Sequence, residues 1–285
     1  MTEIIANERL APQVYRMIVT GPEIARKRKA GQFIILRPLP HSERIPLTIA
    51  DASSDCGTIT LVYQVVGKTT HELSLLKTGE RLQDLVGPLG QPTHIEKFGT
   101  VVCVGGGIGV APIHPIAQAL KAHGNRVISI LGARTRELLI MEEEMRRASD
   151  EVIVTTDDGS YGTKGFVTDA IKQLADSGTA IDLVVAIGPP IMMKFVAKTT
   201  LPYKIKTLVS LNTVMVDGTG MCGGCRVTVG GESKFVCVDG PEFDGHQVDF
   251  DEMMKRLRTY DDQEKSSYEL FKKTHECRLT GAGGR

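Results

Sequence analysis

Asp217-Gly-Thr-Gly-Met-Cys222-Gly-Gly-Cys225 is the stretch around which the chain is organised, and Cys237 follows it after eleven further residues. Closely spaced cysteines of this kind indicate a metal site, and the glycines let backbone N–H groups turn toward bound sulfur. A plant-type [2Fe–2S] site has the spacing C-x4-C-x2-C, followed by a distant fourth cysteine. Asp217 stands at the position of the first cysteine, and a carboxylate can bind iron. The pattern therefore predicts a [2Fe–2S] cluster held by three thiolates and one oxygen, from Asp217, Cys222, Cys225 and Cys237.

Two other interpretations of this stretch stay open on its residues alone. Three cysteines with an aspartate or a histidine would also serve a structural zinc ion. The C-x2-C pair could instead be a redox-active dithiol. The third cysteine and the position of Asp217 favour iron and sulfur over both alternatives.

Composition limits the classes of function. The 285 residues suffice for two or three small domains. Basic and acidic residues balance at 34 each, so no excess of positive charge indicates nucleic-acid binding. No apolar run reaches the roughly 18 residues of a membrane span, and residues 1–8 lack the regions of a signal peptide. We therefore expect a cytoplasmic protein that binds neither nucleic acid nor membrane, where clustered cysteines indicate metal rather than disulfides.

Residues 1–97 carry short β-rich runs separated by turns and show no long helical period. This pattern predicts a small antiparallel barrel with one short helix over residues 70–76. The predicted strands cover residues 13–19, 32–36, 47–50 and 58–66.

Two polar or glycine-bearing spots interrupt this barrel pattern. The first is Arg44-Ile-Pro46-Leu-Thr48, whose arginine fork suits a phosphate. The second is Tyr63-Gln-Val-Val-Gly67-Lys-Thr69-Thr70, where a glycine and hydroxyls precede a helix N-terminus and so make an anion site. Each spot alone could equally be a turn and a helix cap. Together they predict a cradle for a flavin pyrophosphate, with Thr48 able to hydrogen-bond the flavin ring.

From residue 98 to residue 209, apolar strand-like runs alternate with helical stretches, which predicts a doubly wound parallel sheet. Helical spacing is clear over residues 111–122, where four apolar side chains share one face: Ile113, Ile116, Ala117 and Leu120. The predicted strands are 100–104, 127–131, 152–156, 183–187 and 206–210. The predicted helices are 111–122, 136–147, 165–174 and 191–200.

The first of these strands ends in Gly105-Gly-Gly107-Ile-Gly109-Val-Ala-Pro112. Glycines at this point allow a tight turn and the close approach of a dinucleotide to the backbone. The same edge of the sheet receives three more loops that carry glycine, hydroxyl or charge, at residues 132–135, 157–160 and 188–192. The four loops together predict a nucleotide site. Arg134 is a candidate for contact with a 2′-phosphate, but the residues do not decide between NAD and NADP.

The C-terminal third begins with the cluster stretch. Residues 226–237 predict a hairpin turning at Gly230-Gly231, which would bring Cys237 back beside the other two cysteines. Asp249 can cap a helix that begins at the next residue, and its apolar stripe is interpreted as docked core or subunit contact. From Asp261 the chain is charged and is predicted to be a partner-facing or frayed tail, ending at residues 281–285. The predicted division is 1–97, 98–209, 210–248 and 249–285.

The order of these motifs resembles the ferredoxin–NADP reductase superfamily, in the branch of electron-transfer subunits with a C-terminal [2Fe–2S] module. This branch includes electron-transfer subunits of dihydroorotate dehydrogenase and of cytoplasmic hydrogenases. Within it, the chain is most similar to the small subunits of NADH-dependent reduced ferredoxin:NADP⁺ oxidoreductases, and Asp217 in place of a cysteine is the most specific mark. The runs that carry the likeness are 44–51, 105–112, 155–162, 188–193, 215–225 and 236–243.

The resemblance implies a Greek-key FAD-binding barrel, an NAD-binding α/β domain and the cluster module. FAD would contact Arg44, Pro46, Leu47, Thr48, Tyr63, Gln64, Val65, Gly67, Thr69 and Thr70. NAD(H) would contact Gly106, Gly107, Gly109, Arg134, Asp158, Gly159 and Gly188. The sequence departs from the superfamily where the usual Cys-Gly-Pro is Ile187-Gly188-Pro189, so no thiol assists hydride transfer there.

The resemblance also implies the reaction and the partner. Hydride would pass between NAD(H) and FAD, and single electrons between FAD and the cluster, so no catalytic acid or base is expected. A larger flavoprotein subunit with its own FAD and iron–sulfur clusters would complete a NADH-dependent ferredoxin:NADP⁺ oxidoreductase. The alternatives are an electron-transfer subunit of a hydrogenase, a sulfhydrogenase or dihydroorotate dehydrogenase, and, from another class, a zinc-bearing interaction module.

Overall fold

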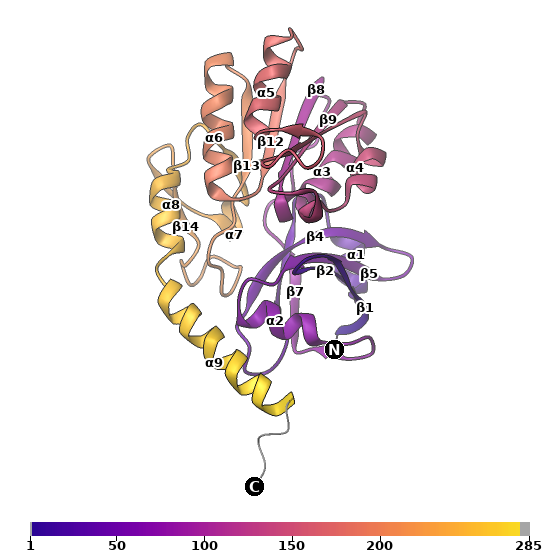
Figure 1. Ribbon diagram of the computed structural model, residues 1–285, viewed down its shortest axis with the longest axis vertical. Helices are drawn as coiled ribbons and strands as arrows, with labels where there is room; N and C mark the ends of the chain where they lie inside the picture. The colour runs from indigo at the N-terminus through magenta and orange to yellow at the C-terminus, as the bar shows by residue number, and fades with distance from the viewer. Residues whose placement is uncertain (1, 280–285) are drawn as a thin grey trace.

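The computed structural model describes residues 2–279, with side chains described up to residue 274. Figure 1 shows an antiparallel barrel from the N-terminal residues, an α/β sheet above it, and a small module beside both that leads into a long C-terminal helix. This arrangement confirms the predicted combination of a β-barrel, a doubly wound α/β unit and a small C-terminal module.

The barrel is a seven-stranded antiparallel sheet in the order β6-β1-β2-β5-β4-β3-β7. Its two edge strands are separated in the chain only by Gln83, so the edges meet and the barrel is nearly closed. The strands are β1 (Thr2–Ala11), β2 (Val14–Thr20), β3 (Phe33–Arg37), β4 (Ile45–Ser53), β5 (Thr58–Gln64), β6 (Arg81–Leu82) and β7 (Asp84–Leu89). The helices are α1 (Pro22–Lys27) and α2 (Lys68–Leu75).

The four predicted strands of this part are β2 to β5, whereas β1, β6 and β7 were not predicted. The ten residues of β1 include only two that are buried, so the strand lacks the alternation of apolar and polar residues that identifies β2 and β5. The predicted short helix is α2, which begins two residues earlier, at Lys68.

The second sheet has the order β11-β10-β9-β8-β12-β13-β16, parallel except for β16, which is antiparallel to β13. The strands are β8 (Thr100–Gly106), β9 (Arg126–Ala133), β10 (Glu151–Thr156), β11 (Thr163–Lys164), β12 (Leu183–Ile187), β13 (Lys206–Ser210) and β16 (Glu242–Asp244). The chain starts at β8 in the middle and proceeds outward first one way and then the other. The loops after β8 and β12 therefore diverge at this switch point, the usual ligand position in such sheets.

Helices cover both faces of this sheet (Figure 1). Two of them, α3 (Val110–Ala122) and α4 (Glu142–Ala148), share one apolar core with Val101 and Cys103. The other two, α5 (Val167–Asp176) and α6 (Pro190–Thr200), share the opposite core with Val102 and Val104. The helix predicted from Arg136 is shorter than expected. Residues Arg136–Leu138 form a 3-10 turn, and Met141, with φ of 56°, breaks the helical path before α4.

The C-terminal module consists of the cluster loop, the hairpin β14 (Arg226–Val229) and β15 (Glu232–Phe235), and the helices α7 (Val236–Asp239), α8 (Phe250–Leu257) and α9 (Asp261–Leu279). The hairpin turns at Gly230-Gly231 as predicted. The expectation of a tail from Asp261 was wrong, because this segment is helix α9. It is held against α2 by Tyr268 and Phe271, whose rings meet His71 edge-on. The predicted role of residues 281–285 lies outside the described residues.

A search of the described residues for a helix long and apolar enough to cross a membrane found none.

Candidate functional site

The four predicted cluster ligands lie in two pairs in the C-terminal module. The Cys222 Sγ atom lies 3.3 Å from the Asp217 Oδ1 atom. The Cys225 Sγ atom lies 3.3 Å from the Cys237 Sγ atom. The hairpin produces the second pair, because Val236 donates a backbone hydrogen bond of 3.2 Å to the Cys225 carbonyl and so places Cys237 beside Cys225. The short loop from Asp217 to Cys222, with four residues between them, produces the first pair.

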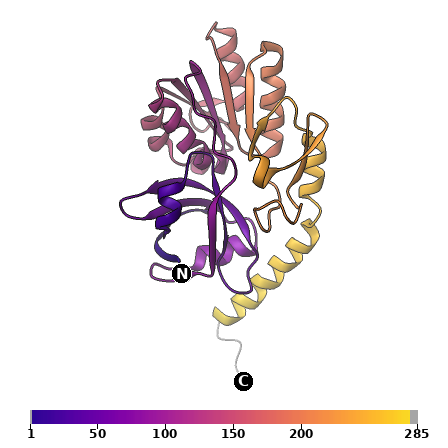
Figure 2. The same ribbon diagram turned by 180° about the vertical axis from the view of Figure 1, so that it is seen from behind.

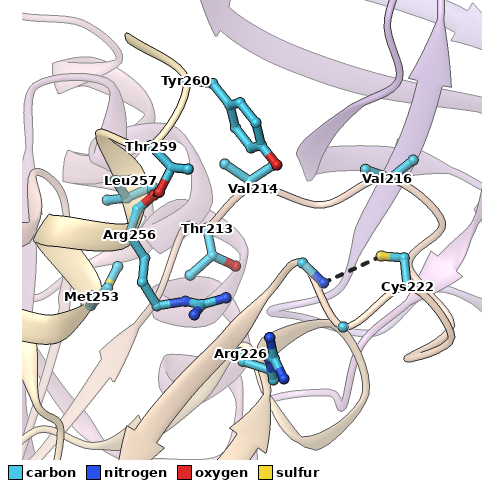
Figure 3. A pocket seen from close by; sticks show the side chains of 12 residues that line it. Thr213, Val214, Val216, Cys222, Arg226, Met253, Arg256, Leu257, Thr259 and Tyr260 are labelled. Atoms are coloured by element: carbon cyan, nitrogen blue, oxygen red, sulfur yellow. Dashed lines mark hydrogen bonds between the residues drawn. The ribbon is translucent and has the colours of Figure 1, made fainter.

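Hydrogen bonds within the cluster loop fix the position of the Asp217 carboxylate, a predicted ligand. Asp217 accepts hydrogen bonds from the backbone N–H groups of Thr219, Met221 and Cys222, at 3.1–3.3 Å. Burial acts to raise its pKa, but the hydrogen bonds from Cys222 and Thr219 lower the pKa to about 2. The carboxylate is therefore ionised at neutral pH, as a metal ligand must be. The Gly224 N–H group points at the Cys222 sulfur, at 3.5 Å (Figure 3).

The arrangement fits a two-iron cluster better than a single zinc ion. Zinc needs four ligands around one point, but among the described residues no three Cys, His, Asp or Glu side chains gather closely enough to hold one metal ion. Two separate pairs suit a [2Fe–2S] cluster, in which each iron takes two protein ligands. Burial and the neighbouring Cys225 raise the pKa of the Cys237 thiol to about 12. Metal binding at this pair would thus displace protons.

The cluster loop packs against the outer face of the barrel, as the view from behind shows (Figure 2). A Cβ atom at Gly218 would lie 2.7 Å from Leu89 and 2.9 Å from Ile35, so the loop backbone touches strands β7 and β3. A second link joins the Gln91 side chain to the Val238 carbonyl, at 2.9 Å. The cluster loop therefore lies on β7 and β3, and β3 pairs with β4, the strand that carries part of the predicted flavin site.

Pro46 and Thr48 lie on this same outer face of the barrel. They pair across the sheet with Ile35 and Phe33, and cross-strand partners point to the same side. Phe33 and Ile35 belong to the apolar core that also contains Cys225 and Cys237. No hydrogen-bond partner of the Thr48 hydroxyl is found within residues 2–279. Leu47 points the other way and packs against the barrel interior.

The other predicted flavin residues are less uniform. The Tyr63 side chain is in the barrel core, stacked on Tyr15 and hydrogen-bonded to Asn7, so only its backbone faces outward. Gln64 and Val65 are half-buried at the end of β5, where Val65 donates to the Gln13 carbonyl. Arg44 is half-exposed, with its guanidinium 3.7 Å from Asp84.

The N-terminus of α2 keeps part of its predicted anion site open. Nothing lies within 4 Å of a Cβ atom built at Gly67. The Thr70 hydroxyl is already used, because it accepts hydrogen bonds from the Val66 and Gly67 N–H groups. Thr69 is buried and reaches Glu43 at 3.5 Å. The first-turn N–H groups that follow Gly67 have no partner within the helix, so these groups, rather than the two hydroxyls, remain as donors.

The predicted nucleotide residues all lie at the carboxyl ends of β8, β9, β10 and β12. Three of the glycines pack closely against neighbours, and Gly109, which faces backbone atoms, has the least room. A Cβ atom would lie 2.2 Å from the Met192 sulfur at Gly106, 2.1 Å from the Ile187 carbonyl oxygen at Gly109, and 2.8 Å from Met192 at Gly188. Gly107 differs, because its φ is 55° and nothing lies within 4 Å of its Cβ position. The backbone at Gly107 is therefore open to a ligand.

The charged residues at this edge have distinct surroundings. Arg134 is exposed, and its carbonyl accepts from the Asp158 N–H group. Hydrogen bonds from the Ser160 hydroxyl and N–H group lower the pKa of Asp158, so this carboxylate is used within its own turn, next to Gly159. Thr155, which the sequence analysis missed, has a buried hydroxyl without a hydrogen-bond partner among the described residues. Only its place at the end of a strand hinted at a role.

Three of the histidines have structural partners. His114 is buried on α3 and reaches the Ala50 carbonyl at 3.4 Å, which ties the α/β part to the barrel. His246 hydrogen-bonds Thr200 at 3.0 Å, and His71 meets Tyr268 at 3.2 Å.

Two protein-family models match the chain. Residues 103–198 match the oxidoreductase NAD-binding domain. Residues 212–249 match the iron–sulfur cluster binding domain of dihydroorotate dehydrogenase B. Together with the barrel, they define the class: an oxidoreductase subunit with a ferredoxin reductase-like fold, which binds NAD and an iron–sulfur cluster.

Relatives narrow the class to a family. The chain is 50% identical over 274 residues, 96% of both chains, to the dihydroorotate dehydrogenase B electron transfer subunit homolog of Thermotoga maritima. It is 33% identical to the electron transfer subunit of Streptococcus mutans, covering 87% of this chain and 97% of the relative. A chain solved in work on electron bifurcation by NADH-dependent reduced ferredoxin–NADP oxidoreductase is 49% identical, with a TM-score of 0.90 and coverage of 95% and 98%. The protein belongs to this family of electron transfer subunits.

Proposed function

We propose that the chain carries electrons from NADH, through FAD on the barrel, to a [2Fe–2S] cluster held by Asp217, Cys222, Cys225 and Cys237. The observation that carries this proposal is the position of the two ligand pairs. Three of these residues lie in a loop that packs on β3 and β7, beside the outer face that presents Pro46 and Thr48, and the hairpin brings the fourth, Cys237, next to Cys225. When bound, the flavin supplies the conversion between hydride transfer and single-electron transfer, and the cluster carries the single electrons.

The residues of the chain would bind and orient these groups. The open backbone at Gly107 and the unpartnered Thr155 hydroxyl support a nucleotide at the edge of the sheet. The Thr48 hydroxyl and the open N-terminus of α2 support a flavin on the barrel, with its phosphates near Gly67. Arg44 would have to leave Asp84 to reach a phosphate. Positioning of the two rings is then the main contribution of the protein.

The chain would consist of four functional units, one for each bound group and one at the C-terminus. The flavin unit would be residues 1–97, the nucleotide unit 98–209, the cluster unit 210–248, and the C-terminal unit 249–285. The free cysteines among the described residues support a reducing compartment such as the cytoplasm.

The partner would be a larger flavoprotein subunit with FAD and iron–sulfur clusters, and the complex a NADH-dependent ferredoxin:NADP⁺ oxidoreductase. The 49% identity to a chain of such an enzyme supports this choice. The relatives named as dihydroorotate dehydrogenase B subunits favour a second candidate, electron transfer for dihydroorotate oxidation. Asp217 counts against it, since that group usually has cysteine at this position.

The first experiment is the content of iron, acid-labile sulfide, zinc and flavin in anaerobically purified protein, with EPR after reduction by NADH. We expect two irons, two sulfides and one FAD per chain, and a rhombic signal from the reduced cluster. Zinc without flavin would contradict the proposal.

The second experiment identifies the reaction. The complex purified with its native large subunit should reduce NADP⁺ with NADH and reduced ferredoxin together. NADH-coupled turnover of dihydroorotate by the same complex would instead establish the second candidate.

A further inference from the structure

A cavity of about 500 Å³ lies beside the cluster loop, and its lining residues all come from the C-terminal module and the segment that leads into it. Its walls come from the loop before and after Cys222, from β14 and from the end of α8 (Figure 3). One of its lining residues is the cluster ligand Cys222, whose side chain is exposed. Anything that fills this cavity therefore comes close to the predicted cluster.

The cavity is positively charged. Its charged lining residues are Arg226 and Arg256, and it has no acidic lining residue. Neither guanidinium group has an ion pair or a hydrogen bond within the described residues. Figure 3 shows Arg256 extending from α8 into the cavity, toward Thr213 and Arg226. Two guanidinium groups at one cavity repel each other unless an anion lies between them.

Two buried polar atoms of the cavity also lack partners. Thr213 is 8% exposed, and its hydroxyl makes no hydrogen bond. The Arg256 Nε atom is likewise buried without a partner. Buried polar atoms normally have partners, because a buried group without one has lost the hydrogen bonds to water that it makes in the unfolded chain. An acceptor in the cavity would satisfy both atoms as well as the free guanidinium groups.

We propose that this cavity receives an acidic side chain, aspartate or glutamate, of the larger partner subunit. A carboxylate matches the planar fork of an arginine, and the apolar walls, which include Met253 and Leu257, suit the carbon stem of such a side chain. Met221, 88% exposed, and Val216, 50% exposed, add an apolar surface on the cluster loop itself. Such a surface suits a contact with another protein. The anchor would fix the partner where the cluster is most accessible.

This inference rests on the proposed function, since it names the contact through which the cluster meets its partner. The test is the affinity of the cofactor-loaded chain for the large subunit that co-purifies with it, for wild type, Arg256→Glu and Lys255→Glu. Lys255 is the exposed neighbour on the same helix and does not line the cavity. The two variants thus have the same charge change at the same helix end. We expect Arg256→Glu to weaken binding at least about 30-fold, and Lys255→Glu less than about threefold.

A milder variant separates a loss of binding from a loss of folding. Arg256→Met keeps the apolar stem and should weaken binding by about tenfold with unchanged thermal unfolding. Equal effects of Arg256→Glu and Lys255→Glu would overturn the proposal, because they would indicate only general attraction between charged surfaces. Wild-type affinity of Arg256→Glu combined with an altered cluster potential would also overturn it, because the arginines would then act on the cluster instead.

Calorimetry of the isolated chain with glutarate tests whether the cavity binds a free small acid instead of a side chain of the partner. Binding of glutarate that is lost in Arg256→Glu, with normal assembly of the complex, would make this a small-molecule site and contradict the proposal. Measurements on the isolated chain also distinguish a failure of the proposed function from a failure of the proposed anchor. If NADH fails to reduce a cluster in the wild-type chain, the proposed function is wrong. If NADH reduces it and Arg256→Glu still binds the partner normally, only the anchor is wrong.

Discussion

Two glycine-rich loops of this protein satisfy different physical needs. In residues 105–109 most glycines are present because their neighbours leave no room. Gly109 has φ of −62°, which any residue can adopt, yet a Cβ atom there would lie 2.1 Å from a carbonyl oxygen. In the cluster loop the need is conformational. The left-handed φ values of 74°, 84° and 64° belong to Gly218, Gly220 and Gly223.

The difference teaches what each loop does. Left-handed glycines turn successive N–H groups inward, so the cluster loop directs hydrogen bonds at Asp217 and Cys222 and prepares them for metal. Close-packed glycines let α3 begin directly against β12, and only Gly107 is left facing open space. One loop is shaped around ligand side chains, and the other around its own backbone with a single open position.

The largest expected effect tests the cluster loop. Cys225→Ser should remove nearly all iron and acid-labile sulfide while FAD stays bound, because one of the two ligand pairs is lost. Cys103→Ser is the matched control, since both cysteines are buried but Cys103 is in strand β8, away from the loop. Metal analysis and flavin absorbance measure the outcome. Equal iron in both variants would contradict the ligand assignment.

The next largest effect tests the packed glycine. Gly109→Ala should lower the free energy of unfolding by about 3 kcal/mol or more, because the added methyl group meets backbone atoms of Ile187 and Gly188, which cannot rotate away. Chemical denaturation followed by circular dichroism measures the change. A stability equal to that of the wild type would show that the start of α3 is not packed as tightly as described.

A third prediction concerns strand β16, which follows the cluster hairpin and pairs with β13 of the α/β sheet. Glu242 of β16 is hydrogen-bonded by Thr93, and burial raises its pKa to about 7, from an ordinary value of 4.5, despite that bond. The folded protein then binds an extra proton between these pH values, so the contribution of Glu242 to stability is greatest below about pH 4.5 and is lost as pH rises to about 7. Glu242→Gln should remove up to about 3 kcal/mol of this fall. Parallel stability profiles of variant and wild type would contradict the prediction.

Much of the fold could be predicted because its signals are local. The apolar runs of the parallel sheet were found within one or two residues, since strands buried on both faces read as continuous apolar stretches. Strand β1 was missed because only Ile4 and Ala11 of its residues are buried. Helix α9 was missed because its mean polarity is high, and it is held through His71 of α2, almost 200 residues earlier in the chain.

The candidate site likewise contains residues that have a local sequence signal and residues that have none. The four predicted cluster ligands could be proposed from spacing, because one loop and one hairpin bring them together. The flavin residues could be proposed but not oriented: spacing alone does not reveal that Tyr63 points into the barrel while Pro46 and Thr48 point out. Arg256 and Thr213 come from different elements and meet only in the folded chain, so their shared cavity left no sequence signal.

The smallest effect tests the one open glycine, and it separates ligand binding from backbone strain. Gly107→Ala should raise the KM for NADH by about tenfold, because a methyl group would occupy the space into which a nucleotide phosphate fits. Gly124→Ala is the matched control. Both glycines have left-handed φ, 55° and 78°, and open Cβ positions, so both variants have the same backbone cost of about 1–2 kcal/mol. Gly124 follows the far end of α3, however, and its variant should keep the wild-type KM. Steady-state kinetics with ferricyanide as the acceptor measures both. Equal KM values for the two variants would place the nucleotide elsewhere, and the contrast between the two loops would then rest on packing alone.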